Sequence, residues 1–396
     1  MADYLSSMYL LLSNHSESSQ KLMNWFNLTE EDFAIMMNMS SQRSVVNHTQ
    51  VRDETTPCYW LRDLSTRYRQ LHGYIALLVC VFGTIANVLN VVVLTRKEMA
   101  AAPINRILTA IAVADMHVML DYIPFAIYMY IVRFPNDSPD FSYAGAIFTL
   151  FHMHFSQILH TISICLTLTL ALWRYIAIRY PQKSQQLCSD HNCTLAIALA
   201  FALPPIICIP SYLVFSVRST TIIEEHQVVT LYILGLSDLA REHNELLYNV
   251  NFWVYAVVIK LIPCVVLTIV SYYLITMLYE VNERRQRLKG EGSKGEKRVD
   301  RTTRMLVAVL LLFLITEVPQ GVLGLLSGTL GRQFFKNCYH QFGDMMDILA
   351  LINGAINFIL YCSMSQQFRT TFSQLFKPKM LSKWAPPDTE HKTSFV

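Results

Sequence analysis

Seven ionisable residues lie inside long apolar stretches of this 396-residue sequence. They are Asp115, Asp121, Arg174, Lys260, Glu317, Asp344 and Asp347. A charge in such surroundings is costly unless it finds a partner, and at membrane depth such residues usually bind a ligand or operate a switch. A purely structural helical bundle does not need so many. These residues therefore indicate a binding or switching function.

Lys260 and Glu317 form the sharpest candidate pair. Lys260 lies three residues before Pro263, and Glu317 lies two residues before Pro319. If the two stretches are antiparallel neighbours with both prolines near mid-depth, the charges lie at a similar depth. We predict that they pair, because leaving either charge alone would be costly. The alternative is that each side chain is neutral and solvated in a water-filled cavity.

Histidines and cysteines do not form a metal or catalytic set. His152, His154 and His160 share one apolar stretch, but the first two are two residues apart and point to different faces of a helix. Most of the nine cysteines fall inside apolar runs, where they act as small packing residues. No Ser/His or multi-His array lies at a matching depth, which argues against a membrane enzyme.

Seven stretches are long and apolar enough to cross a bilayer as helices, which takes about 20 residues each. We place them at residues 72–95, 105–132, 143–178, 194–215, 246–278, 301–326 and 339–362. Residues 366–376 carry phenylalanines at helical spacing, which fits a short amphipathic helix lying in the membrane interface. The predicted fold class is an all-α membrane protein, a seven-helix bundle with a short eighth helix. Transporters often show internal repeats with broken helices, and none is visible.

Composition and charge agree with a membrane protein. Charged residues make up 15% of the chain, against about 25% in soluble domains. The net charge of +3 is too small to indicate a nucleic-acid partner. Basic residues gather in the first, third and fifth connections and in the tail, which predicts that these are cytoplasmic and the N-terminus is outside.

The N-terminal arm carries four N-glycosylation sequons, which agrees with an extracellular position. They begin at Asn14, Asn27, Asn38 and Asn47. We expect three parts in a plasma-membrane protein: a glycosylated extracellular arm (1–71), the transmembrane bundle (72–364) and a cytoplasmic amphipathic helix with a tail (365–396).

Motifs in six of the seven stretches resemble those of rhodopsin-like, or class A, G-protein-coupled receptors, over about residues 71–376. They are Asn87, Leu-Thr-Ala-Ile-Ala-Val-Ala-Asp115, Trp173-Arg174-Tyr175, Pro263, Phe313 with Pro319, and Asn357-Phe-Ile-Leu-Tyr361. Three longer strings are similar to invertebrate myosuppressin and FMRFamide-like peptide receptors, which bind peptides ending in Arg-Phe-amide. These strings are Arg301-Thr-Thr-Arg-Met-Leu-Val-Ala-Val, Thr316-Glu-Val-Pro-Gln-Gly and Gly343-Asp-Met-Met-Asp-Ile-Leu-Ala-Leu-Ile-Asn.

The resemblance implies a polar network inside the bundle. Asp115, Ser163, Asn353 and Asn357, with Asn87 close by, match the positions that hold a sodium ion in inactive relatives. Carboxylate, hydroxyl and amide oxygens are suitable ligands for a small hard cation. The alternative is a hydrated hydrogen-bond network without an ion. No other cofactor is expected.

The resemblance also implies a set of activation and G-protein-contact residues. They are Trp173, Arg174, Tyr175, Phe313, Pro319 and Tyr361, with Asp300 as a candidate partner of Arg174. Relatives usually have an acid where Trp173 stands, so we hypothesise a weak inactive-state latch; a backbone or water contact is the alternative partner for Arg174. Relatives also have tryptophan at Glu317, proline at Phe358 and tyrosine at Ser271.

The ligand arginine implied by the resemblance requires a carboxylate. Asp344 and Asp347 are three residues apart and can share one helix face, so we predict that one of them binds it. The amide and phenylalanine end is expected to be lined by Asp121, Tyr122, Phe125, His160 and Gln320. The alternative for Asp344 is a solvated helix terminus.

Most relatives have a disulfide between the start of the third helix and the loop after the fourth helix. Residues 143–150 and 216–245 contain no cysteine, so both partners are missing here. The cysteines that remain on the outer side are Cys58 and Cys338, at the outer ends of the first and last helices, which are neighbours in this fold. We predict that they bridge and tie the N-terminal arm over the ligand cavity. Free thiols are the alternative.

The expected function is a neuropeptide receptor that couples an amidated Arg-Phe-type peptide to a heterotrimeric G protein, with the inhibitory class favoured, and to arrestin. The terminal Ser394-Phe395-Val396 fits a ligand of a PDZ domain. The alternatives are a receptor for an unrelated peptide or small ligand and, much less favoured, a membrane transporter.

Overall fold

The computed structural model describes residues 58–133, 142–224, 227–241, 246–287, 294–330, 334 and 338–376. The chain divides into two compact units. One contains Met1–Tyr59 and Ser219–Leu231, and the other contains Trp60–Arg218 and Tyr232–Val396. The larger unit holds the helical bundle and the candidate site.

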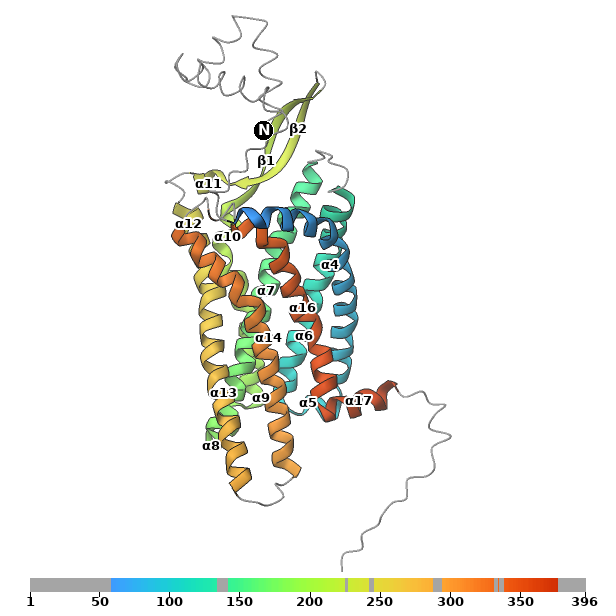
Figure 1. Ribbon diagram of the computed structural model, residues 1–396, viewed down its shortest axis with the longest axis vertical. Helices are drawn as coiled ribbons and strands as arrows, with labels where there is room; N and C mark the ends of the chain where they lie inside the picture. Colours follow the sequence, from blue (N-terminus) through green and yellow to red (C-terminus); the bar gives the residue numbers. More distant parts are fainter. Residues whose placement is uncertain are drawn as a thin grey trace, which may run out of the picture. The chain divides into compact units, whose positions relative to one another are not determined.

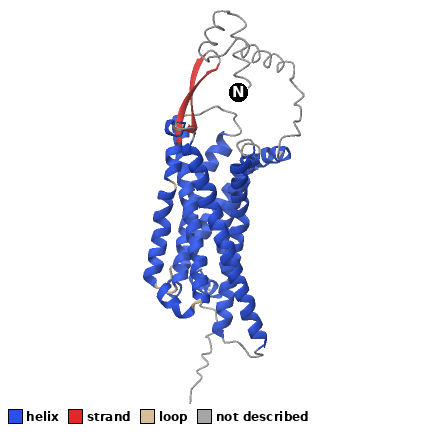
Figure 2. Cartoon of the chain, turned by 90° about the vertical axis from the view of Figure 1, so that its left-hand side faces the viewer, coloured by secondary structure: helices blue, strands red, loops and turns tan. Residues whose placement is uncertain are grey.

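Within the described residues, seven helical spans are long and apolar enough to cross a membrane, which confirms the predicted fold class (Figures 1 and 2). The first three spans are built by α4 (Tyr59–Leu94), by α6 (Pro103–Ala126) with the π-helical η1 (Ile127–Arg133), and by α7 (Tyr143–Arg179). The fourth and fifth are built by α9 (Asp190–Ile207) with α10 (Ile209–Val214), and by α12 (Leu246–Trp253), η4 (Val254–Leu261) and α13 (Ile262–Arg287). The last two are built by α14 (Lys294–Leu330) and α16 (His340–Met364).

Short elements connect or follow the spans. Three are helices of one or two turns: α5 (Lys97–Ala100), α8 (Pro181–Leu187) and α11 (Asp238–Arg241). The strands β1 (Phe215–Glu224) and β2 (Gln227–Leu236) form a two-stranded sheet between the fourth and fifth spans. The amphipathic helix α17 (Gln366–Phe376) has the bounds predicted from the sequence.

Prolines explain several local features of the helices. Pro103 begins α6, where its missing N–H has no helical partner to lose. The two π-helical segments each lie close to a proline: η1 follows Pro124, and η4 ends just before Pro263. A proline leaves the carbonyl one turn earlier without a donor, and a π-turn is one way to satisfy the freed groups inside a membrane.

Three apolar clusters hold the bundle together. The first joins α4, α6, α7, α9 and α16 to α17, around Leu170, Tyr361 and Phe368. The second joins α7, η4, α13 and α14 around Phe313, and the third joins α4, α6 and α16 around Met119. Apolar side chains also point outward along the spans, which is the pattern expected where a helix meets lipid.

The structure differs from the sequence expectation at two places. The first helix begins at Tyr59 rather than at residue 72, because residues 59–71 include charged side chains and so lack the continuous apolar character used to place a span. The β1–β2 hairpin was not predicted, although β-branched residues such as Thr220, Ile222 and Val228 favour strands there.

Candidate functional site

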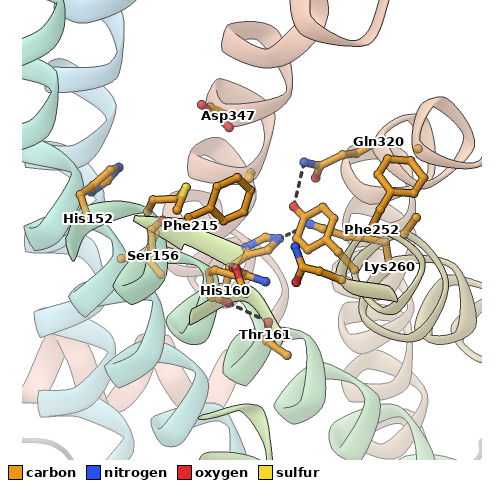
Figure 3. Close-up of a pocket in the computed structure, with 18 of the residues that line it drawn as sticks. His152, Ser156, His160, Thr161, Phe215, Phe252, Lys260, Gln320 and Asp347 are labelled. Atoms are coloured by element: carbon orange, nitrogen blue, oxygen red, sulfur yellow. Dashed lines mark hydrogen bonds between the residues drawn. The ribbon is translucent and has the colours of Figure 1, made fainter. Parts of the chain in front are cut away.

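The candidate site is a cavity of about 500 Å³ between the helices (Figure 3). Residues of α6, α7, α10, α12, η4, α14 and α16 line it, together with Phe215 of β1, Leu234 of β2 and Tyr339. Most of the lining is apolar or aromatic, and a few polar groups converge on it. This combination is typical of a ligand-binding cavity.

Lys260, Glu317 and His160 form a buried cluster at the floor of the cavity. The Lys260 ammonium donates to Glu317 Oε2 at 2.7 Å, so the structure brings together the pair expected from the sequence. Both side chains are almost fully buried, at 2% and 1% exposure. The Lys260 Nζ also lies 2.7 Å from His160 Nε2, and that nitrogen is 3.2 Å from Glu317.

The two histidine contacts place different demands on Nε2 of His160. An ammonium group at Lys260 has only donors, so the 2.7 Å contact takes Nε2 as acceptor, whereas a hydrogen bond to the Glu317 carboxylate takes it as donor. Lys260 and Glu317 supply one positive and one negative charge to the cluster. It joins α7, η4 and α14, which are three different spans.

Asp347 offers the cavity a carboxylate. It lines the cavity, and among the described residues no basic side chain forms an ion pair with it. Asp344 does not line the cavity: it accepts a hydrogen bond from the Tyr130 hydroxyl at 2.8 Å and lies 3.7 Å from Arg69. Of the two acids proposed for a ligand arginine, only Asp347 is positioned in the cavity.

Asp121 lies behind the cavity rather than in it. Its carboxylate is 2.8 Å from Nδ1 of His152, and the His152 ring stacks on Phe125 with centroids 3.7 Å apart. His152 and Phe125 both line the cavity, whereas Asp121 does not. Asp121 therefore positions His152 and Phe125 in the cavity wall. The sequence led us to expect that Asp121 itself lines the cavity, and the structure places it outside the lining.

The remaining predicted ligand residues all line the cavity. Tyr122 shares a hydrogen bond of 2.9 Å with His72 of α4, which fixes its ring. Gln320 donates to the Tyr255 hydroxyl at 3.3 Å. Sequence reasoning missed Tyr255, Phe252 and Tyr339, which also line the cavity. Tyr255 and Phe252 could have been found from the sequence, because they are aromatic, lie three residues apart and shortly precede Lys260.

Asp115 is the centre of the polar network. Ser163 donates to Asp115 Oδ1 at 2.7 Å, and Asn357 donates to Oδ2 at 3.2 Å. Asn87 donates to the Gly354 carbonyl at 3.0 Å, and Asn353 is half-buried on α16. Asn357 Oδ1 is buried without a hydrogen-bond partner in the described part of the chain, so an oxygen is left that a water or a small cation could use.

The predicted activation residues lie toward the other end of the bundle. Trp173 packs against the cluster around Leu170, and Arg174 lies with it beside a hollow lined by α6, α7 and α8. Tyr175 has its ring 6.0 Å from that of Tyr273 on α13. Asp300 belongs to α14, but its side chain lies outside the described residues.

Three further predicted features can be placed. Phe313 is buried in the cluster of α7, α13 and α14, and Pro319 lies inside α14. Tyr361 is buried against Phe368 of α17, and Phe358 contacts the same ring at 6.0 Å, so a residue that replaces the usual proline helps to hold α17.

The cysteines fall into two groups. Cys58 and Cys338 are disulfide-bonded, and the other seven are free. The sequence predicted a bridge between these two residues. In the absence of the disulfide usual in relatives, the hairpin has other contacts: Arg218 pairs with Asp238, and the Tyr143 ring at the start of α7 lies 5.2 Å from that of Tyr232. The Arg218 hydrogen bond lowers the pKa of Asp238 below its usual value.

The four glycosylation sequons and the C-terminal PDZ-type sequence lie outside the described residues.

Comparison with known proteins gives consistent matches. Residues 74–379 match the family described as serpentine type 7TM GPCR chemoreceptor Srw. The chain is 32% identical to the G-protein coupled receptor dmsr-1 of Caenorhabditis elegans, over 78% of this chain and 69% of that protein. It is 28% identical to the sex peptide receptor of Drosophila melanogaster (82% of this chain, 76% of that one). It is 25% identical to the FMRFamide receptor of the same species (89% and 66%).

Proposed function

Since the chain belongs to the family of seven-helix G-protein-coupled receptors, we propose that it is a cell-surface neuropeptide receptor for an amidated peptide of the Arg-Phe type. Family membership makes it a multi-pass plasma-membrane protein and a receptor rather than an enzyme. Its similarity to receptors named for sex peptide and for FMRFamide supports a peptide ligand.

Asp347 carries the proposal for the ligand class. A hydrogen bond with Tyr122 compensates this carboxylate only in part, because it has no basic partner in the described part of the chain. An arginine guanidinium can supply that partner through two parallel hydrogen bonds. The aromatic rings of Tyr122, Phe125 and Phe252 surround the rest of the cavity and suit a phenylalanine side chain.

The signalling side of the proposal follows the family. Binding shifts α13 and α14 relative to the other helices, opens the end of the bundle near Arg174 and engages a heterotrimeric G protein, with the inhibitory class favoured. Arrestin and a PDZ-domain protein are the further partners we propose. The basic connections and the N-terminal sequons support an N-terminus outside the cell.

A receptor for an unrelated small ligand is the second candidate, because a cavity of about 500 Å³ is within the range that holds a small molecule. A binding panel separates the two. Amidated peptides ending in Arg-Phe, the same peptides ending in Lys-Phe or citrulline-Phe, and small amines are tested on cells that express the chain.

Substitution of Asp347 gives the sharper test. We expect D347N to weaken the response to Arg-Phe-amide peptides by about 100-fold, since a buried charged contact is lost, and to remove the preference for arginine over citrulline. D344N is the matched control, one helical turn away, because Asp344 is already engaged by Tyr130 and Arg69. Equal effects of the two variants, or unchanged arginine preference in D347N, would contradict the proposal.

A further inference from the structure

Of the three residues in the buried cluster at the cavity floor, two line the cavity and one does not. Lys260 and His160 line the cavity (Figure 3), whereas Glu317 does not; the side chains of Lys260 and Glu317 are 2% and 1% exposed. The Glu317 carboxylate that neutralises Lys260 thus lies outside the lining, behind the lysine and the histidine. The distance of 2.7 Å between Lys260 Nζ and Glu317 Oε2 makes this neutralisation direct.

The charges of the whole cavity wall can be counted in the same way. Four ionisable side chains other than tyrosine line it: His152, His160, Lys260 and Asp347. His152 Nδ1 lies 2.8 Å from Asp121 Oδ2 behind it, Lys260 pairs with Glu317, and His160 contacts both members of that pair. Asp347 is the lining carboxylate that, within the described residues, has Tyr122 as a hydrogen-bond partner but no basic partner. The cavity thus complements a ligand with one positive group and no negative group near the floor.

Lys260 and Asp347 lie at different depths in the bundle, and the difference suits the length of an Arg-Phe dipeptide. Lys260 lies 14 residues into the span that starts at Leu246, and Asp347 lies 6 residues into the span that starts at Gln341. At about 1.5 Å per residue, this difference of eight residues places the floor roughly 12 Å deeper than Asp347. One Cα–Cα step of about 3.8 Å and an extended arginine side chain cover a similar distance.

We propose that Glu317 determines specificity for the C-terminal group of the ligand: by neutralising Lys260 from behind, it makes the floor accept a neutral carboxamide and reject the carboxylate of the same peptide. The inference rests on the proposed peptide function. A carboxylate at the floor would lose its water and find an ammonium group whose charge is already compensated. A carboxamide has no charge to lose and can hydrogen-bond to His160 or Gln320.

The test measures competition binding of one Arg-Phe peptide as amide and as free acid, and takes the ratio of the two affinities. In the wild-type receptor we expect the amide to bind at least about 100-fold more tightly.

In E317Q, which exposes the Lys260 charge to the cavity, the acid binds more tightly than to wild type and the ratio falls by about 10-fold or more. In K260Q, which leaves the Glu317 charge without its partner, the ratio does not fall. In the double variant K260Q/E317Q, which is again neutral, the ratio returns to within about 3-fold of K260Q.

A ligand-side measurement needs no variant and covers the case in which E317Q fails to reach the cell surface. The methyl ester of the same peptide is neutral like the amide but lacks its N–H donors. We expect the ester to bind the wild-type receptor within about 10-fold of the amide and well above the acid.

The outcomes distinguish failure of the proposed function from failure of the inference about Glu317. If the wild type binds neither amide nor acid, the proposed function fails and this inference fails with it. If the wild type binds the amide, but E317Q lowers the affinities of both forms equally, the role of Glu317 is structural and only this inference is overturned. An ester that binds as weakly as the acid overturns it too, since selection would then depend on the amide N–H groups.

Discussion

At the level of single residues, polar side chains of this receptor are used to join helices. Ser163 of α7 and Asn357 of α16 both donate to Asp115 of α6, and Asn87 of α4 donates to the backbone of α16. In a membrane no water is available to replace such contacts, so each one fixes a helix against its neighbours. The cluster of Lys260, Glu317 and His160 does the same for α7, η4 and α14.

Gly354 allows the close contact between α16 and α6 beside Asp115. A Cβ atom at this position would lie 3.1 Å from Cε of Met119, a flexible chain end, and 3.3 Å from both Cβ and Cγ of Asp115. Asp115 cannot retreat without breaking its hydrogen bonds to Ser163 and Asn357. We expect G354A to lower the stability of the purified receptor by about 1–2 kcal/mol, despite the better helix propensity of alanine. A thermal unfolding curve in detergent measures this.

Gly343 provides the matched control on the same helix. A Cβ atom there would meet no atom within 4 Å. G343A should therefore leave the melting temperature unchanged or raise it slightly. If G354A melts no lower than G343A, close packing at Asp115 is not what requires a glycine.

At the level of elements, the ends of the helices explain what sequence reasoning could and could not predict. The seven spans and α17 follow from apolar length and from phenylalanine spacing, both of which are local. The start of α4 at Tyr59 could not be found this way, because residues 59–71 are helical without being continuously apolar. The β1–β2 hairpin has a local signal in its β-branched residues, but apolar length alone does not reveal it.

Cys58 and Cys338 lead to a prediction at this scale. Peptide mapping without reduction should give one linked peptide that contains both residues, and the free thiols of the other cysteines. C58S and C338S should each lower thermal stability, by about 2–5 kcal/mol, and the double variant should be no worse than either, since all three remove one bond.

Cys188 supplies the control for the disulfide, because it is a free thiol near the opposite end of the bundle. C188S should change neither the mapping nor the stability. Alkylation of both Cys58 and Cys338 in the native receptor, or additive losses in the double variant, would show that the bridge does not form.

At the level of the whole molecule, we propose a bundle with two states, whose balance depends on contacts at both ends. The floor of the cavity could be predicted in part: the prolines near Lys260 and Glu317 indicated their common depth. The third member, His160, could not be assigned to the cluster, because its partner depends on how α7 is rotated against η4 and α14. Asp121 was misplaced for the same reason, since helical spacing alone does not show which neighbour a side chain faces.

Trp173 leads to a prediction about the balance of the two states. It stands where relatives usually have an acid, and it packs against the apolar cluster of α7 and its neighbours. We expect measurable nucleotide exchange on the G protein without ligand, and W173D should reduce it several-fold by placing a carboxylate beside Arg174.

W173F retains an aromatic contact without adding a charge, so it should keep the basal activity of the wild type. A wild-type receptor that is silent without ligand, or equal effects of W173D and W173F, would contradict the weak-latch hypothesis.

The most direct test of the central claim is nucleotide exchange on a purified inhibitory-class G protein by the receptor reconstituted in lipid. The account predicts that an amidated Arg-Phe peptide accelerates exchange above the basal rate in a dose-dependent manner, and that D347N shifts the response to about 100-fold higher concentration while D344N does not. Unchanged exchange across a full panel of amidated peptides and G-protein classes, from a receptor shown to be folded, would contradict it.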